Sequence, residues 1–84
     1  MSGAAMAKGE EELRGEVLEE LEAFFEAAEV REMKIEELTY ELADKIGISR
    51  TSIWRWRAGT ARPMRALLPS IRKGVKALSK KHDF

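Results

Sequence analysis

The sequence predicts an all-α protein, a small bundle of four to five helices. Apolar residues recur with helical spacing in three separate stretches, and no stretch alternates apolar and polar residues as strands do. The run from Leu42 to Gly59, LADKIGISRTSIWRWRAG, adds two short helices joined by a tight glycine turn, the pattern of a helix-turn-helix. A chain of 84 residues forms one domain with a modest core, for which association with a second copy is a further source of stability.

The composition argues against several classes of protein. The absence of cysteine leaves no disulfide framework and no thiolate metal site, and the single histidine, His82, is expected to be a solvated tail residue. We expect no metal, no cofactor and no enzymatic activity, because the carboxylates fall on a solvated helix face without a catalytic set around them. The absence of a signal peptide and of a long apolar run favours a soluble cytoplasmic protein with no membrane partner.

The formal net charge is zero, but the charge is divided between the two halves of the chain. Residues 1–48 carry 5 basic and 14 acidic side chains, whereas residues 49–84 carry 10 basic side chains and 1 acidic one. A neutral protein whose basic charge is gathered on one surface is able to bind nucleic acid. The alternative is that the acidic first helix pairs with the basic C-terminal residues inside the domain, and we expect both to apply in part.

Residues 1–9 are small, contain two glycines and predict a flexible arm ahead of a domain that spans residues 10–81. A first helix is predicted from Glu10 to about Val30. Leu18 and Phe25 flank its apolar stripe and make the apolar band wide. Either the helix is thoroughly buried in the core, or Leu18 and Phe25 pack on a second subunit. The stripe consists of Leu13, Val17, Leu21, Phe24 and Ala28.

Two further helices are predicted over Lys34–Ile46 and Arg50–Arg57. Gly47 favours a left-handed end to the first of them, and Gly59 ends the second in the same way. Ser49 offers a side-chain oxygen to the free N–H groups at the start of the second helix. The residues expected to face inward are Ile35, Leu38, Leu42, Ile46, Ile53 and Trp56.

A basic loop, Thr60–Arg62, leads to Pro63 and to a short turn. Proline is disfavoured inside a helix but suits its first position, so a last helix is predicted from Pro69 to about Lys80. Residues 82–84 are expected to form a C-terminal tail. Ile71, Val75 and Leu78 face inward on the last helix, and the region around Val75 and Leu78 is the alternative subunit interface if Phe25 belongs to the core.

The run ISRTSIWRWRAGTARP resembles the helix-turn-helix of the Cro/C1-type (XRE-like) phage and bacterial repressors. That family carries a Ser-Arg-(Ser/Thr)-x-Ile-x-x-Trp-x-x-Gly run followed by a basic loop and a proline, matched here by Arg62-Pro63. A fainter resemblance links the Ile-x-x-Trp helix to the phage CII-type activators. The resemblance implies a helical domain that binds a short DNA operator as a dimer or tetramer. Where the family usually has Thr-Gln, this chain has Leu38-Thr39, and Thr39 is the candidate for the family's phosphate contact before the turn.

The residues expected to contact bases lie on the outward face of the helix that begins at Arg50. Arg50 and Arg55 suit bidentate contact with guanine O6 and N7, and Thr51 suits a thymine methyl group or a base edge. Trp54 either lies against sugar and a thymine methyl group, or folds back over an arginine stem, or packs on a neighbouring subunit. Ala58 lets the helix approach DNA closely.

A second set of residues is expected to contact phosphate, which raises affinity without adding sequence information. Arg62 and Arg65 follow the recognition helix, where the family touches phosphate. Arg57 lies near the core flank and either holds a phosphate or pairs with an acidic residue of the first helix. The full set is Thr39, Ser49, Ser52, Arg57, Thr60, Arg62 and Arg65.

We therefore expect a sequence-specific regulator of transcription, a repressor of phage, plasmid or prokaryotic type that binds double-stranded DNA at an inverted repeat as a homodimer. Two alternatives are open. One is a DNA-binding accessory protein of a mobile element that acts in packaging, excision or partition, which the position of a footprint would reveal. The other is a protein-interaction module in which Trp54 and the acidic first helix grip a polypeptide, which an absence of DNA binding at low salt would favour.

Overall fold

Helices account for all the regular structure of residues 9–84, the part of the chain that the computed structural model describes, and no strand occurs there. The all-α prediction is confirmed. The flexible arm predicted for residues 1–9 falls, apart from Gly9, outside the described residues. The elements are α2 (Glu10–Val30), α3 (Ile35–Ile46), α4 (Arg50–Ala58), the 3-10 helix η1 (Arg65–Leu67) and α5 (Leu68–Lys81).

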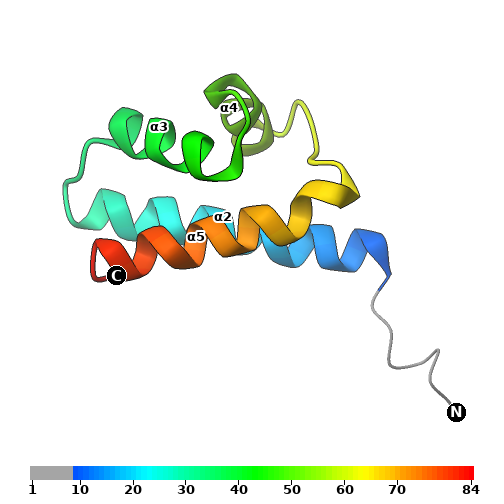
Figure 1. Ribbon diagram of the computed structural model, residues 1–84, viewed down its shortest axis with the longest axis horizontal. Coiled ribbons are helices and arrows are strands. Elements are labelled where there is room, and N and C mark those ends of the chain that lie inside the picture. Colours follow the sequence, from blue (N-terminus) through cyan, green and yellow to red (C-terminus); the bar gives the residue numbers. More distant parts are fainter. Residues whose placement is uncertain (1–8) are drawn as a thin grey trace, which may run out of the picture.

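The two long helices form one layer, and α3 and α4 pack on one side of it (Figure 1). α2 and α5 run side by side in the same direction. Leu13 lies near Leu68 at one end, and the ring of Phe24 packs on that of Phe84 at the other, with 5.3 Å between the ring centroids. This layer supports α4 from one side and leaves the opposite side of α4 facing away from the bundle.

The core lies between this layer and the α3–α4 pair. Four of the six inward residues predicted on α3 and α4 are buried: Leu38, Leu42 and Ile53 are at most 1% exposed, and Trp56 is 7% exposed. The other two, Ile35 and Ile46, are half-buried and pack against the core. Burying one such side chain contributes about 1.5–3 kcal/mol relative to leaving it exposed. Their burial holds α4 in a single rotational setting, so its outward residues are set as well.

Phe25 is a core residue, which corrects its predicted place in a subunit interface. Its side chain is 0% exposed in the single chain and makes an edge-on contact with Phe24, with 5.2 Å between the ring centroids. Leu18 is half-buried and packs against the same core. The apolar band of α2 is wide because α2 contacts α3, α4 and α5 within one chain.

The turn between α3 and α4 forms with the caps that the sequence predicts. Gly47 has a φ of 84° and Gly59 a φ of 79°, both in the left-handed region that glycine adopts at low cost. The hydroxyl of Ser49 accepts a hydrogen bond from the N–H of Ser52 at 3.4 Å. Three residues, 47–49, therefore carry the chain from α3 into α4.

The C-terminal residues pack on the bundle, which corrects the expectation of a solvated tail. The Nε2 atom of His82 lies 3.0 Å from a carboxylate oxygen of Glu41, and Lys81 forms an ion pair with the same carboxylate. Phe84 covers Phe24. Its partner lies 60 residues earlier in the chain, so no local pattern around Phe84 indicates this contact.

Candidate nucleic-acid interface

The outward face of α4 carries the residues predicted to contact bases. Thr51, Trp54, Arg55 and Ala58 are exposed, and the exposed fraction of the large Trp54 side chain is 43%. Arg55 has no ion-pair partner in residues 9–84. This face therefore presents a hydroxyl group, an indole ring and a free guanidinium group to the surroundings.

Arg50, the first residue of α4, lies close to two aromatic rings. Its guanidinium carbon is 4.2 Å from the centroid of the Tyr40 ring, on α3, and 5.6 Å from that of Trp54. Contact with an arginine was one of the interpretations left open for Trp54, and it is present in the free protein. Sequence reasoning missed Tyr40. The available signal was an aromatic residue on the outward side of the helix before the turn, two residues from each of the inward positions Leu38 and Leu42.

A shallow depression lies beside this stack, between α3 and the start of α4. It is open to the surroundings and includes Asp44, which forms no ion pair with Arg50. The N–H donors of Arg50 are therefore not occupied by a carboxylate. The depression is lined by Tyr40, Ala43, Asp44, Ile48, Ser49, Arg50 and Thr51.

Three of the four hydroxyl groups predicted to touch phosphate take part in local hydrogen bonds at the ends of α4. Ser49 caps the helix and its Oγ atom lies 3.2 Å from that of Ser52. The hydroxyl of Thr60 donates to the carbonyl of Arg55 at 3.4 Å. Ser49 and Thr60 are exposed and Ser52 is half-buried, so all three lie at the border of the outward face of α4.

Two of the predicted phosphate contacts are engaged inside the domain and are corrected here. Thr39 is 0% exposed, and its hydroxyl donates to the carbonyl of Ile35 at 2.7 Å, because it lies on the buried side of the second turn of α3. Arg57 donates from Nε to Glu22 at 3.0 Å and lies 4.1 Å above the ring of Phe25. The alternative of an acidic partner on the first helix is therefore the one found for Arg57.

Arg62 and Arg65 are both exposed, in the segment that follows α4. Arg62 forms two hydrogen bonds with the carboxylate of Glu11, at 3.2 and 2.5 Å. Such exposed pairs contribute at most about 1 kcal/mol, so phosphate is able to compete with Glu11 for Arg62. Arg65 has no ion-pair partner in the described residues.

Arg14 is a second residue whose role sequence reasoning missed, because it connects the start of α2 to the segment after α4. It is 7% exposed, and its Nε atom donates to the carbonyl of Pro63 at 2.8 Å. It also forms ion pairs with Glu10 and Glu11, and the hydrogen bond from Arg14 is the main cause that lowers the pKa of Glu10. Its position seven residues before Leu21, on the apolar stripe, was the signal that this arginine needs a buried partner.

Both interpretations of the divided charge apply in part. Acidic residues of α2 hold Arg57, Arg62 and Arg72 from the basic half of the chain, so part of the charge is paired internally. The remaining cations lie on α4 and the segment after it, on α5, in the last turn of α3 and at the end of α2. Those without an ion-pair partner within residues 9–84 are Arg31, Lys45, Arg50, Arg55, Arg65, Lys73, Lys76 and Lys80.

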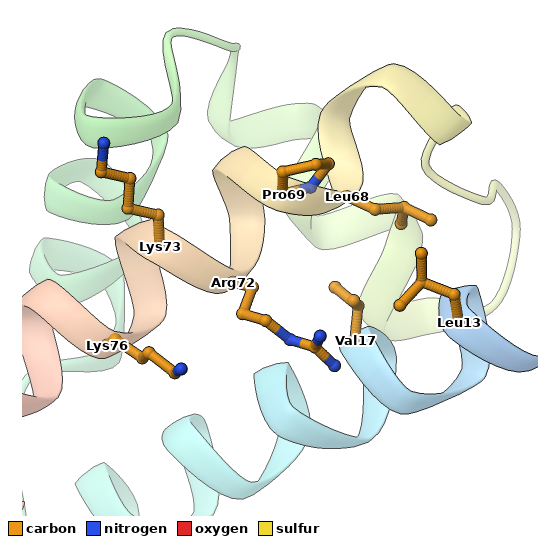
Figure 2. Close-up of a pocket in the computed structure, with 7 residues that line it drawn as sticks. All are labelled: Leu13, Val17, Leu68, Pro69, Arg72, Lys73 and Lys76. Carbon is orange, nitrogen blue, oxygen red and sulfur yellow. The ribbon is translucent and has the colours of Figure 1, made fainter. Parts of the chain in front are cut away.

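A groove lies between the N-terminal parts of α2 and α5 (Figure 2). Val17 and Leu68 in its floor are each 1% exposed, so they offer almost no apolar surface to a ligand. Arg72 on its rim is engaged with Glu20 at 2.8 Å. We assign no ligand to this groove. It is lined by Leu13, Val17, Leu68, Pro69, Arg72, Lys73 and Lys76.

Within residues 9–84 no group of three or more acidic or histidine side chains is arranged to hold a metal ion. None of the helices there combines the length and apolar character needed to cross a membrane. No family model, curated protein or solved structure matches the chain. Its function is therefore inferred from its own residues.

Proposed function

We propose that the protein is a sequence-specific DNA-binding regulator of transcription, of the repressor type, that inserts α4 into the major groove. The observation that carries the proposal is the outward face of α4. Arg50, Thr51, Trp54 and Arg55 lie together on this face, while Ile53 anchors the opposite side in the core. An indole ring beside guanidinium groups that have no carboxylate partner offers apolar surface and N–H donors, and DNA base edges accept both kinds of contact.

The dimensions and donors of α4 fit double-stranded DNA. An α-helix with its side chains is about 10–12 Å across, close to the width of about 12 Å of the major groove. The nine residues of α4 extend for about 13 Å along the helix axis. Arg50 and Arg55 offer paired N–H donors for guanine O6 and N7, and Thr51 offers a hydroxyl and a methyl group. Arg65, and Arg62 after release from Glu11, supply phosphate contacts beside the groove.

A homodimer on an inverted repeat is part of the proposal. A helix of nine residues reaches only a few base pairs, and pairing of half-sites is how such short helices gain specificity. The subunit contact must use residues other than Phe25, and Val75 and Leu78 are also buried within one chain, at 7% and 1% exposure. The subunit contact is therefore expected on other, exposed parts of the surface.

The experiment is a selection of binding sites from random duplex DNA, followed by titration of the selected and a scrambled duplex. Arg55→Ala is expected to lose about 1–3 kcal/mol on the selected duplex and much less on the scrambled one. Lys80→Ala is the matched control, because it removes the same charge from an exposed, unpaired residue on α5. An absence of enrichment together with an absence of binding at low salt would refute the proposal.

Two alternatives have separate tests. An accessory DNA-binding protein of a mobile element would leave its footprint at a recombination, packaging or partition site and not at a promoter. A protein-interaction module is favoured by the exposed Trp54 and by acidic residues on the outer side of α2, such as Glu12, Glu19 and Glu26, that have no ion-pair partner in the described chain. Failure to bind DNA at low salt would support the module.

A further inference from the structure

The two arginines on the outward side of α4 differ in how they are held. Arg50 is half-buried, and its guanidinium group lies over the ring of Tyr40 and close to that of Trp54. Arg55 is exposed and has neither an aromatic contact nor an ion-pair partner in residues 9–84. Arg50 is therefore held by aromatic contacts that Arg55 lacks.

We propose that Tyr40 is a positioning residue that holds Arg50 as a guanine-specific reader at the start of α4. This inference rests on the proposed function and assigns the chemistry of one base contact. A ring stacked on a guanidinium group covers its face and leaves the N–H groups at its edge free. Two of those N–H groups have the spacing of guanine O6 and N7.

The position of Tyr40 makes this role separable from folding. Tyr40 is 49% exposed, so replacing its ring opens no cavity in the core. Asp44 lies in the same depression without pairing with Arg50, and the donors of Arg50 stay available for a base. Ordering an arginine in advance avoids an entropic cost on binding that corresponds to about 2- to 10-fold in affinity.

The first test replaces each guanine of the selected duplex in turn by 7-deazaguanine, which lacks the N7 acceptor. We expect one guanine whose replacement weakens the wild type but leaves Arg50→Ala unaffected, which identifies the base that Arg50 reads. Tyr40→Leu is expected to bind the unmodified duplex about 2- to 10-fold more weakly and to lose part of the discrimination at that guanine. Tyr40→Phe keeps the ring and is expected to behave as the wild type.

Equal losses for Tyr40→Leu on the modified and unmodified duplexes would overturn the proposal, because Tyr40 would then act as a general contact. An unchanged affinity would overturn it as well. Circular dichroism of Tyr40→Leu, compared with that of the wild type, ensures that any loss is not caused by unfolding.

The second test needs no DNA and keeps this inference distinguishable from the proposed function. Nitrogen-15 relaxation of the arginine Nε–H groups should show Arg50 to be more ordered than Arg55 in the free protein. In Tyr40→Leu the order of Arg50 should fall towards that of Arg55, and in Tyr40→Phe it should not. Equal mobility of the two arginines in the wild type would refute the positioning role. If Arg50 is ordered but the protein binds no DNA, the contact between Tyr40 and Arg50 stands and the role of Arg50 in reading guanine is refuted.

Discussion

Phe25→Ala is expected to destabilise the fold strongly, since Phe25 is a core residue and not part of a subunit interface. The side chain is fully buried, makes an edge-on contact with Phe24 and lies 4.1 Å beneath the guanidinium group of Arg57. Truncation of a buried phenylalanine to alanine costs about 3–5 kcal/mol. The aromatic pair contributes about 0.5–1.5 kcal/mol and the cation contact about 0.5–1 kcal/mol beyond burial, which favours the upper part of that range.

This loss is large for a chain of 84 residues, whose whole free energy of unfolding is expected to be about 4–13 kcal/mol. Chemical denaturation followed by circular dichroism measures the loss of unfolding free energy. The midpoint of thermal unfolding should fall by more than about 10 °C. Phe25→Leu retains most of the buried volume but loses the aromatic and cation contacts, so it is expected to cost about 1–2.5 kcal/mol, less than Phe25→Ala. Phe25→Glu should unfold the chain instead of only separating subunits.

The reasoning is refuted if Phe25→Ala leaves the unfolding midpoint unchanged while sedimentation shows a change from dimer to monomer. That pair of results would place Phe25 at a contact between copies. Leu18→Ala, at a half-buried position on the same helix, serves as the comparison and should destabilise the chain less than Phe25→Ala.

Three further predictions concern charge. Arg65→Ala should weaken binding to all DNA sequences alike and lower the slope of log K against log salt by about 1 per subunit; an unchanged slope would exclude a phosphate contact. Glu11→Gln should strengthen DNA binding at low salt, because it releases Arg62 from its paired carboxylate, and an unchanged affinity would show that Arg62 stays away from phosphate. The Glu41 carboxylate accepts a hydrogen bond from Lys81, and this bond lowers the pKa of Glu41 from the ordinary 4.5. The stability that the ionised carboxylate contributes is therefore present above pH 4.5 and is lost as the pH falls through the lowered pKa. The midpoints of thermal unfolding of the wild type and of Glu41→Gln should therefore converge as the sample is acidified. A difference between the midpoints that does not change with pH would contradict the ion pair.

The orientation of α4 was predictable from the sequence because it depends on local spacing. Ile53 and Trp56 are three residues apart and identify the inward side of the helix, and the structure buries both. Gly47 and Gly59 identify the ends of helices because the left-handed conformation is cheap only for glycine, and both have positive φ. These rules operate within a few residues, so they do not depend on the rest of the fold.

The roles of single polar residues were harder to predict, because a polar side chain near the surface has several possible partners. Arg57 was expected to hold a phosphate or an acidic residue, and only the packing of α2 beside α4 selects Glu22, 35 residues away in the chain. Arg14 reaches Pro63 across 49 residues in the same way. Tyr40 was overlooked because its importance comes from lying opposite Arg50 across the turn, which helical periodicity does not reveal.

By itself, the sequence determined that the chain is helical, where its helices end, and which side of α4 faces the core, since backbone caps and apolar spacing are local properties. The place of Phe25 in the core and the set of arginines without an acidic partner follow from the packing of the helices. Those outcomes depend on which helices surround α2: contacts with α3, α4 and α5 bury Phe25, while Arg57, Arg62 and Arg72 find acidic partners on α2. Burial and pairing depend on how the helices are arranged in space, so the sequence of a single helix does not predict them.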